Sequence, residues 1–410
     1  MFRKLLAIII LMPAVSCKHE PEHAQLIPGS QVYLDSLQGQ SAYVTKDYAG
    51  NVVLSWVRMN DDSTFAFCYA VSKDGATFSA PVVIPNSGNI QPHGENLPKI
   101  IFKPSGEIIA LWGVGNPNKH NKYSGLVNYV QSFDAGKTWS RPRSLVSDTA
   151  SYDQRYYDVA ILPGGEAGVV WLDNRKTLST VGSGVYYSTT NGRNGFSDGK
   201  LVSEPACQCC RTVLFPDKEG NLHVLYRAII QDSIRDMVTI MSSDAGKTFS
   251  APRRISNDNW VINACPHTGP AMTENEDGLQ YSWFTGGSNS GTYYASCAAP
   301  GGDIAHHERV TPTGSHPQMA TLGKNLTTVV WDQYSSPGSA ELKRIGVQVR
   351  EGNDELVPAT YITNGEEACS FPVIHPLDER KFFVAYTAKK EGRSRVAYRV
   401  VEVREQAVLP

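Results

Sequence analysis

Short segments in which apolar and polar residues alternate recur along most of the chain. Residues 98–102 and 107–112 are rich in β-branched and aromatic side chains and are separated by a turn that contains glycine. A third segment of the same kind follows at 126–131. Segments with the 3.6-residue period of an amphipathic helix are scarce. The pattern predicts an all-β protein built from short strands joined by turns.

This group of strands repeats seven times. Its first strands begin at intervals of 46 to 60 residues, near Ser41, Leu97, Tyr157, Arg211, Pro270, His316 and Ser370. Such spacing is typical of four-stranded propeller blades. The last copy has three strands of its own, and residues 31–35 could supply the fourth, which would close the ring and remove the free sheet edges. We therefore predict a β-propeller of seven blades, with six blades as the alternative.

Four turns between strands share a sequence motif. The pattern Ser-x-Asp-x-Gly-x-Thr-aromatic occupies 132–139 and 242–249, with a shortened copy at 72–78 and a decayed one at 188–196. The Ser and Asp side chains can bond backbone amides in a hairpin turn, and Gly permits a positive φ. The motif resembles the Asp-boxes of the sialidase superfamily, which mark a propeller fold and carry no catalytic group. The resemblance implies that these turns lie on the bottom face of the ring.

The opposite, top face of such a propeller carries the residues that precede the first strand or follow the second strand of each blade. Propellers usually bind ligands there, and most of the reactive side chains of this chain fall at these positions. Candidates for acid–base or nucleophilic catalysis are Asp158, Tyr157 and Glu95. Candidates for binding a substrate are Arg155, Arg211, Arg227, Arg235, Asp173 and Arg175, and the first four of these would bind an anionic group.

Two cysteine motifs extend the resemblance. Cys-x-Cys-Cys at 207–210 and Cys-Pro-x-x-Gly-Pro at 265–270 resemble those of a subgroup of exported sialidase-like bacterial proteins, and the resemblance covers most of 40–400. It implies an exo-α-sialidase by fold alone. A sialidase needs three arginines for the substrate carboxylate, a Tyr–Glu pair as nucleophile and an Asp as acid–base. The Phe/Tyr-Arg-Ile-Pro segment that supplies the first of these arginines is absent, and none of the candidates matches a family motif at the family's position.

Five of the eight cysteines are predicted to lie on the top face, namely Cys207, Cys209, Cys210, Cys265 and Cys369, whereas Cys68 and Cys297 lie on third strands as buried apolar residues. Disulfides between two adjacent loops are one interpretation. The other is a soft metal site for copper(I) or zinc, with ligands Cys207, Cys209, Cys210, Cys265 and His267. Five cysteines cannot all pair with one another, and two of these are adjacent in sequence. A reactive thiol, or a mixture of these states, is a third interpretation.

The N-terminus has the pattern of an export signal. Two basic residues precede an apolar run at 5–13 that is too short to span a bilayer. Small residues before Cys17 resemble the lipobox of bacterial lipoproteins, which implies removal of 1–16 and a lipid on Cys17; an ordinary secretory signal is the alternative. We expect a tether at 17–30, a single propeller domain at 31–410, and a lipid anchor in the bacterial cell envelope, on the periplasmic or cell-surface side.

The composition narrows the class of partner. Of 410 residues, 41% are hydrophobic and 19% are charged, and the formal net charge is −2, which excludes a bulk cationic surface for nucleic acid. We expect a monomer that meets the membrane only through its lipid and binds a glycan or a small anionic ligand. Three functions stay open: a Cys/His-rich ligand or metal site, a sialidase-like glycoside hydrolase, and a non-catalytic propeller that binds glycan or protein.

Overall fold

The computed structural model describes residues 24–60, 64–119, 121–149, 153–175, 181–335 and 342–405. The predicted signal peptide at 1–16 and the predicted lipidation site at Cys17 lie outside the described residues. The fold is all-β: the described part of the chain contains one short 3₁₀ turn, Gly192–Asn194, and otherwise only strands and loops. In this part there is no helix with the length and apolar character needed to cross a bilayer.

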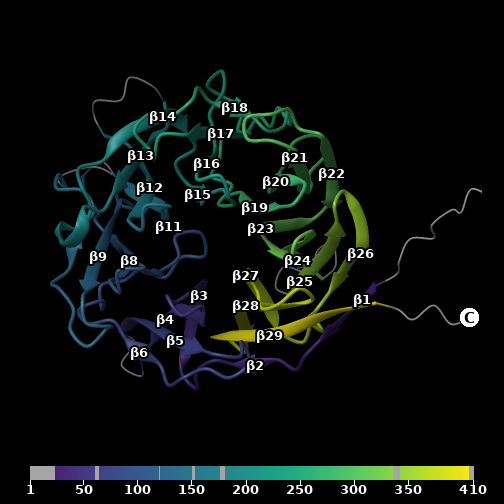
Figure 1. The fold of residues 1–410 in the computed structure, drawn as a ribbon, viewed down its shortest axis with the longest axis horizontal. Helices are drawn as coiled ribbons and strands as arrows, with labels where there is room; N and C mark the ends of the chain where they lie inside the picture. The colour runs from purple at the N-terminus through teal and green to yellow at the C-terminus, as the bar shows by residue number, and fades with distance from the viewer. Residues whose placement is uncertain are drawn as a thin grey trace, which may run out of the picture.

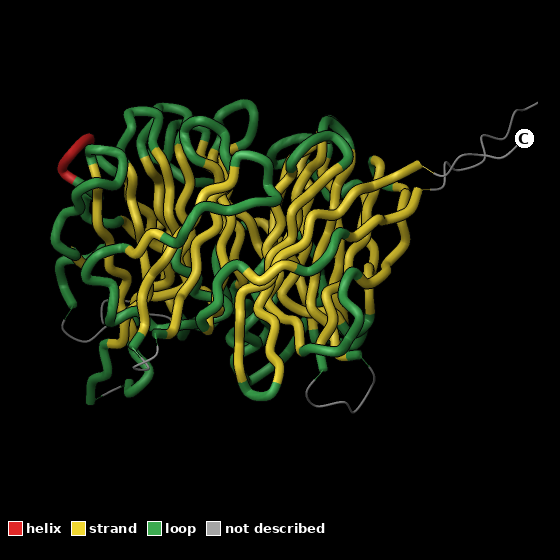
Figure 2. Tube along the Cα trace, turned by 90° about the horizontal axis from the view of Figure 1, so that it is seen from below, coloured by secondary structure: helices red, strands yellow, loops and turns green. Residues whose placement is uncertain are grey.

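Seven antiparallel sheets form a closed ring around a central channel (Figure 1), which confirms the prediction of a seven-bladed propeller over the six-bladed alternative. The strands run between two faces that carry the connecting loops (Figure 2). The 3₁₀ turn, red in Figure 2, joins the third and fourth strands of its blade and marks the bottom face. The connections from one blade to the next lie on the opposite, top face because neighbouring strands are antiparallel.

The strands of the first four blades are, for blade 1, β3 (Gln38–Lys46), β4 (Val52–Met59), β5 (Phe65–Ser72) and β6 (Val82–Val83); for blade 2, β7 (Lys99–Phe102), β8 (Ile108–Gly115), β9 (Gly125–Ser132) and β10 (Arg143–Ser144); for blade 3, β11 (Gln154–Ile161), β12 (Ala167–Asp173), β13 (Ser183–Thr189) and β14 (Lys200–Ala206); and for blade 4, β15 (Val213–Pro216), β16 (Leu222–Arg227), β17 (Met237–Ser242) and β18 (Arg253–Arg254).

The remaining strands are, for blade 5, β19 (Ala271–Asn275), β20 (Gly278–Thr285), β21 (Gly291–Cys297) and β22 (His306–Thr311); for blade 6, β23 (Gly314–Leu322), β24 (Leu326–Tyr334), β25 (Lys343–Glu351) and β26 (Asp354–Tyr361); and for blade 7, β27 (Ala368–Pro376), β28 (Lys381–Lys390), β29 (Arg393–Glu405) and, from the start of the chain, β1 (Ala24–Pro28) and β2 (Val32–Tyr33).

The N-terminal strands close the ring, as the sequence predicts. The long strand β29 pairs with β1 at its end, where Leu26 faces Val403, and with β2 nearer its start, where Val32 faces Tyr398. Strand β1 begins at Ala24, so the sheet extends into the range 17–30 that we expected to be a tether. Both partners together cover an edge of β29 that would otherwise present unpaired backbone groups to solvent.

The core consists of the layers between adjacent blades. At equivalent places on the second strands stand seven large aromatic side chains, each at most 1% exposed: Trp56, Trp112, Trp171, Tyr226, Trp283, Trp331 and Tyr386. Each contributes a large apolar surface to the layer between sheets, and its truncation to alanine would cost about 3–5 kcal/mol. Each repeat therefore supplies one large aromatic side chain, which is buried only when the blade has a neighbour to pack against.

The turns that carry the repeated Ser-x-Asp motif are held by their own side chains. In the connection between β9 and β10, the backbone amide of Thr138 donates to Asp134 Oδ1 at 2.8 Å and that of Gly136 donates to Ser132 Oγ at 2.9 Å. The connection between β17 and β18 repeats these bonds. Gly136 has φ +84°, a conformation that glycine adopts at little cost. These turns join third to fourth strands and so lie on the bottom face, away from the cysteine loops.

Removal of the closing strands should weaken the whole ring. A protein that begins at Ser36 lacks β1 and β2, so one edge of β29 is left unpaired. We expect a lower melting temperature and greater self-association than in a matched protein that begins at Ala24, measured by thermal unfolding and size-exclusion chromatography. Equal melting temperatures and equal monodispersity of the two proteins would contradict the conclusion that β1 and β2 stabilise the ring by covering the edge of β29.

Candidate functional site

The top mouth of the channel is formed by residues with unusual backbone conformations. Five non-glycine residues at the starts of inner strands have φ between +50° and +60°: Ser41, Tyr156, His267, His316 and Phe371. In blades 1, 3, 6 and 7 this residue lies where the pairing of the first strand shifts register. A left-handed conformation costs a residue with a side chain roughly 1–2 kcal/mol. Such strain concentrates where the surrounding structure fixes a particular side-chain position.

A buried ion pair crosses the mouth of the channel. Glu95, from the loop that precedes blade 2, forms an ion pair with Arg211 of blade 4, and its second oxygen accepts the backbone amide of Gly269 of blade 5 at 2.6 Å. Arg211 also donates to the backbone carbonyl of Pro317 in blade 6. A Cβ at Gly269 would lie 2.2 Å from the Arg211 side chain, so only glycine allows this approach. One ion pair thus connects four blades.

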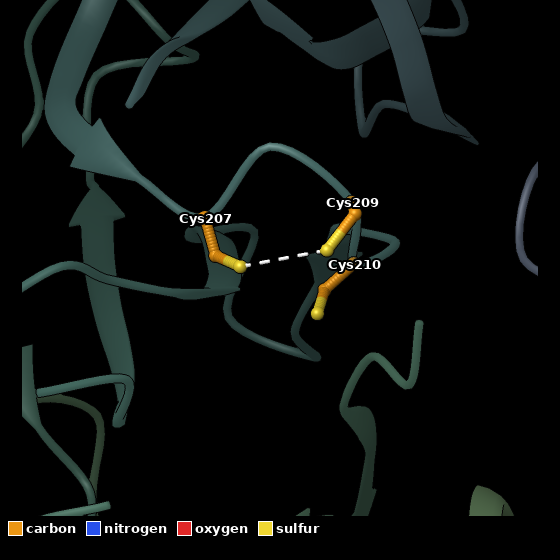
Figure 3. Close-up of side chains that lie close together, drawn as sticks. All are labelled: Cys207, Cys209 and Cys210. Atoms are coloured by element: carbon orange, nitrogen blue, oxygen red, sulfur yellow. Dashed lines mark hydrogen bonds between the residues drawn. The ribbon is translucent and has the colours of Figure 1, made fainter. Parts of the chain in front are cut away.

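Three cysteines gather beside this ion pair. Cys207, Cys209 and Cys210 lie in the loop between β14 and β15 and are 5%, 3% and 2% exposed. Their sulfur atoms point toward one another (Figure 3) and all lie within 4.8 Å of each other. Cys207 Sγ and Cys209 Sγ are 3.7 Å apart. Every cysteine in the described part of the chain is a free thiol, so the structure has the converging arrangement and not the disulfides.

A second group shares one of these cysteines. The ligand atoms of Cys209, Cys265 and His267 also lie within 4.8 Å of one another. Cys265 and His267 belong to the loop between β18 and β19 and are exposed to solvent. The five residues proposed from sequence as metal ligands therefore do come together. Cys369 does not join them, because it is buried in the apolar layer between blades 6 and 7.

The three buried thiols do not ionise independently. Burial disfavours a thiolate at Cys210, but hydrogen bonds from Cys207 and Cys209, the charge of Arg227 and the backbone amide of Thr268 together lower its pKa well below the ordinary value. The same hydrogen bonds raise the pKa of Cys209.

Two aromatic side chains border the exposed part of the cysteine group. The ring of His93 lies 5.5 Å from that of Tyr156 and 5.7 Å from that of His267. Burial, together with the nearby His267 and Arg155, lowers the pKa of His93 to about 4. The Nδ1 atom of His93 accepts the backbone amide of Glu95 at 3.0 Å, so the neutral ring carries its proton on Nε2. His93 can therefore donate a hydrogen bond at the mouth of the channel.

The predicted catalytic residues are not grouped on the top face. Tyr157 is fully buried, and its hydroxyl shares its one proton between the carbonyl oxygens of Leu97 and Leu111, at 2.6 and 2.8 Å, so it fastens blade 3 to blade 2. Asp158 accepts from Lys99 Nζ at 2.8 Å and lines a cavity inside the channel to which all seven blades contribute. Glu95 is engaged with Arg211. The structure thus places the three residues in three different environments.

The predicted anion-binding residues are each held by partners of their own. Arg155 forms two hydrogen bonds with Asp153, of 2.6 and 2.7 Å. Arg227 is buried over the Trp260 ring and donates to three backbone carbonyl oxygens. Arg175 bonds Asp173 at 2.9 Å and lies over the ring of Tyr186. Arg235 is the exception, because its Nε and Nη1 atoms are buried without a hydrogen-bond partner and only its backbone amide is bonded, to the carbonyl of Trp260. With Arg211 bound to Glu95, these guanidinium groups do not form one carboxylate clamp.

One further group on this face had no assigned role from the sequence. His316 Nδ1 lies 2.7 Å from the buried carboxylate of Asp332, which also accepts from Lys343 Nζ and from the backbone amide of Phe371. Burial alone would raise the pKa of Asp332, but His316 and Lys343 hold it well below its usual range. The order of residues could have indicated this pair, because His316 lies near the start of the first strand and Asp332 near the end of the second strand of the same blade, so both lie toward the top face.

Comparison with known proteins shows similarity of fold. No family model matches the chain, and no curated protein matches it. Among solved structures, a protein of unknown function from Dyadobacter fermentans DSM 18053 is 15% identical over 92% of this chain and 99% of its own, with a TM-score of 0.53. The polysaccharide lyase Uly1 is 13% identical over 90% of each chain, with a TM-score of 0.56. The NanB sialidase from Streptococcus pneumoniae is 10% identical over 95% of each chain, with a TM-score of 0.47. The likeness is one of fold alone.

Loss of one partner of the channel ion pair should destabilise the fold strongly. Glu95→Ala leaves Arg211 buried without its counter-charge, which typically costs about 3–5 kcal/mol. The double variant Glu95→Leu/Arg211→Met removes both charges and should recover part of this loss. Urea unfolding of the three proteins measures the effect, and a single variant as stable as the unmodified protein would contradict the assigned role.

The Asp332 carboxylate should make stability depend on acid pH. Its native pKa lies below the value of about 3.9 in the unfolded chain, so its contribution is complete above about pH 5 and is lost as the pH falls through the native pKa. Asp332→Asn should therefore cost about 3–5 kcal/mol at pH 7 and less near pH 3. Urea unfolding at several pH values tests this, and a difference between the two proteins that does not change with pH would contradict it.

Proposed function

We propose that this propeller binds a soft metal ion, copper(I) or zinc, at the top mouth of its channel. The observation that carries the proposal is that two groups of three ligand atoms meet at Cys209, with Cys207 and Cys210 in one group and Cys265 and His267 in the other, while none of the described cysteines is in a disulfide. Thiolate and imidazole ligands are those that select copper(I) and zinc in proteins.

The spacing of the sulfurs supports coordination. Two sulfurs bound to one ion at about 2.3 Å and a tetrahedral angle lie roughly 3.8 Å apart. Cys207 and Cys209 are separated by 3.7 Å, close to this value and far from the roughly 2.05 Å of a covalent bond. The buried group of Cys207, Cys209 and Cys210 offers three sulfurs without a fourth ligand. Three donors suit copper(I) better than zinc, whose structural sites are almost always four-coordinate.

The surroundings favour a charged thiolate site. Arg227 lies close enough to Cys210 to lower its pKa, and the backbone amide of Thr268 donates to the same sulfur. Positive charge and hydrogen-bond donors around sulfur stabilise bound thiolate and retain the metal. The exposed Cys265 and His267 leave a path by which an ion can enter from solvent.

The cellular setting is part of the same proposal. A lipid on Cys17 would hold the propeller at a bacterial envelope membrane, where a bound metal would also protect clustered thiols from oxidation. A sialidase-like hydrolysis finds no comparable support, because Arg155, Arg211 and Arg227 are engaged with Asp153, Glu95 and backbone carbonyls, which leaves fewer than the three arginines that a carboxylate clamp needs.

Metal binding can be tested directly on untagged protein. Protein purified anaerobically should bind copper(I) in competition with a chromophoric chelator. In the double variant Cys265→Ser/His267→Asn the exposed group keeps only Cys209, so the copper(I) bound by that group should be held at least about 10–100-fold more weakly, since loss even of outer partners of metal ligands has effects of this size. Asn is chosen because it tolerates the φ of +50° at His267.

The matched control is Cys68→Ala, which removes a buried thiol that belongs to neither ligand group and should leave binding unchanged. Protein that binds neither copper(I) nor zinc, and whose loop cysteines are isolated as disulfide-linked peptides, would eliminate the proposal in favour of a covalent staple.

A further inference from the structure

The five ligands of the proposed site form two groups and not one. Cys207, Cys209 and Cys210 make up one set of mutually close sulfurs, and Cys209, Cys265 and His267 make up the other. The ligand atoms of a single ion with bonds of about 2.3 Å lie at most roughly 4.6 Å apart, which is twice the bond length. The arrangement therefore offers one ion position on each side of Cys209, which is the only member common to both groups among the described residues.

We propose that the site holds two copper(I) ions bridged by the thiolate of Cys209. This rests on the proposed function and specifies its stoichiometry. The inner ion is bound by Cys207, Cys209 and Cys210, and the outer ion by Cys209, Cys265 and His267. A thiolate sulfur has enough lone pairs to bind two soft ions at once, and three ligands for each ion match the low coordination number of copper(I).

The charges and protons of the assembly balance. In the bound state Cys207, Cys209, Cys210 and Cys265 are all thiolates; each proton that one of these sulfurs carries beforehand is released to solvent, and both ions keep their oxidation state. Four thiolates and two copper(I) ions leave two negative charges. Arg227 lies near the inner sulfurs and Arg155 near Cys209, so these charges face two guanidinium groups.

The two positions differ in access to solvent. The inner ligands are at most 5% exposed, whereas Cys265 and His267 of the outer position are exposed. An ion in the inner position can leave only after the loop opens, but an ion in the outer position can be taken or given by a ligand in solvent. The outer ion is accordingly the one that exchanges, and His93 at its border can donate a hydrogen bond to an incoming anionic ligand.

The number of bound ions tests the inference. Copper(I), supplied anaerobically as its acetonitrile complex, is added in excess, and metal and protein are quantified after desalting. We expect two ions per chain in the unmodified protein and in the Cys68→Ala control, and one in either Cys265→Ser, which loses an outer ligand, or Cys207→Ser, which loses an inner ligand. Cys209→Ser should retain at most one. A bathocuproine chase should remove the outer ion first, so the ion left in Cys265→Ser should be removed more slowly than the one left in Cys207→Ser.

The number of copper ions bound per chain distinguishes failure of the two-ion site from failure of metal binding itself. One ion in the unmodified protein overturns the two-ion site but leaves metal binding intact, whereas no ion overturns the proposed function itself. Two ions that persist in Cys209→Ser overturn the bridge. X-ray absorption of the unmodified protein gives a test that does not depend on the folding of any variant: a copper–copper scattering path supports the shared thiolate, and two bound ions without that path contradict it.

Discussion

The ion pair between Glu95 and Arg211 is the constraint on which the top face depends. Two charges buried in the channel of the ring are tolerated only as a hydrogen-bonded pair, so their positions fix the backbone on both sides. Arg211 directly follows Cys210, and Gly269, which donates to Glu95, lies two residues after His267. His93 lies two residues before Glu95. The pair therefore sets the relative positions of the three loops that make the site.

Other contacts keep this arrangement without using the ligand side chains. Arg227 binds the carbonyl oxygens of Thr268 and Phe284 and so holds the second cysteine loop against blade 4. The amide of Tyr156 donates to Asn96 and its carbonyl accepts from Thr212, which ties blade 3 to both neighbours. Apart from the amide of Thr268, which donates to Cys210, the sulfurs of Cys207, Cys209 and Cys210 interact with one another. Fixed loops of this kind would lower the cost of ordering the ligands of the metal ion proposed above.

The sequence predicted those parts of the molecule that depend on period and order. The interval between copies predicted the blades, and the order of strands predicted that the loops at 207–210 and 265–267 meet. It did not predict the directions of Tyr156, Tyr157 and Asp158, because the pairing of β11 shifts register between Arg155 and Asp158. A bulge breaks the alternation of faces along a strand. Tyr156 consequently borders the mouth, Tyr157 lies between blades and Asp158 lines the channel.

The arginines at the mouth of this propeller are bound differently from those of a propeller that binds anions. An anion-binding propeller needs arginines whose guanidinium groups are free at the mouth, because each must form its bonds with the ligand. Here Arg211 is bound to Glu95 and Arg227 to backbone carbonyls, and both bonds position cysteine loops. Because their terminal nitrogen atoms are already bound, Arg211 and Arg227 are not available to bind the carboxylate of a ligand, and they fix the positions of the loops that carry the thiols instead. The chemistry of the mouth is thus set by what the buried charges bind, and a shared ring of blades does not determine it.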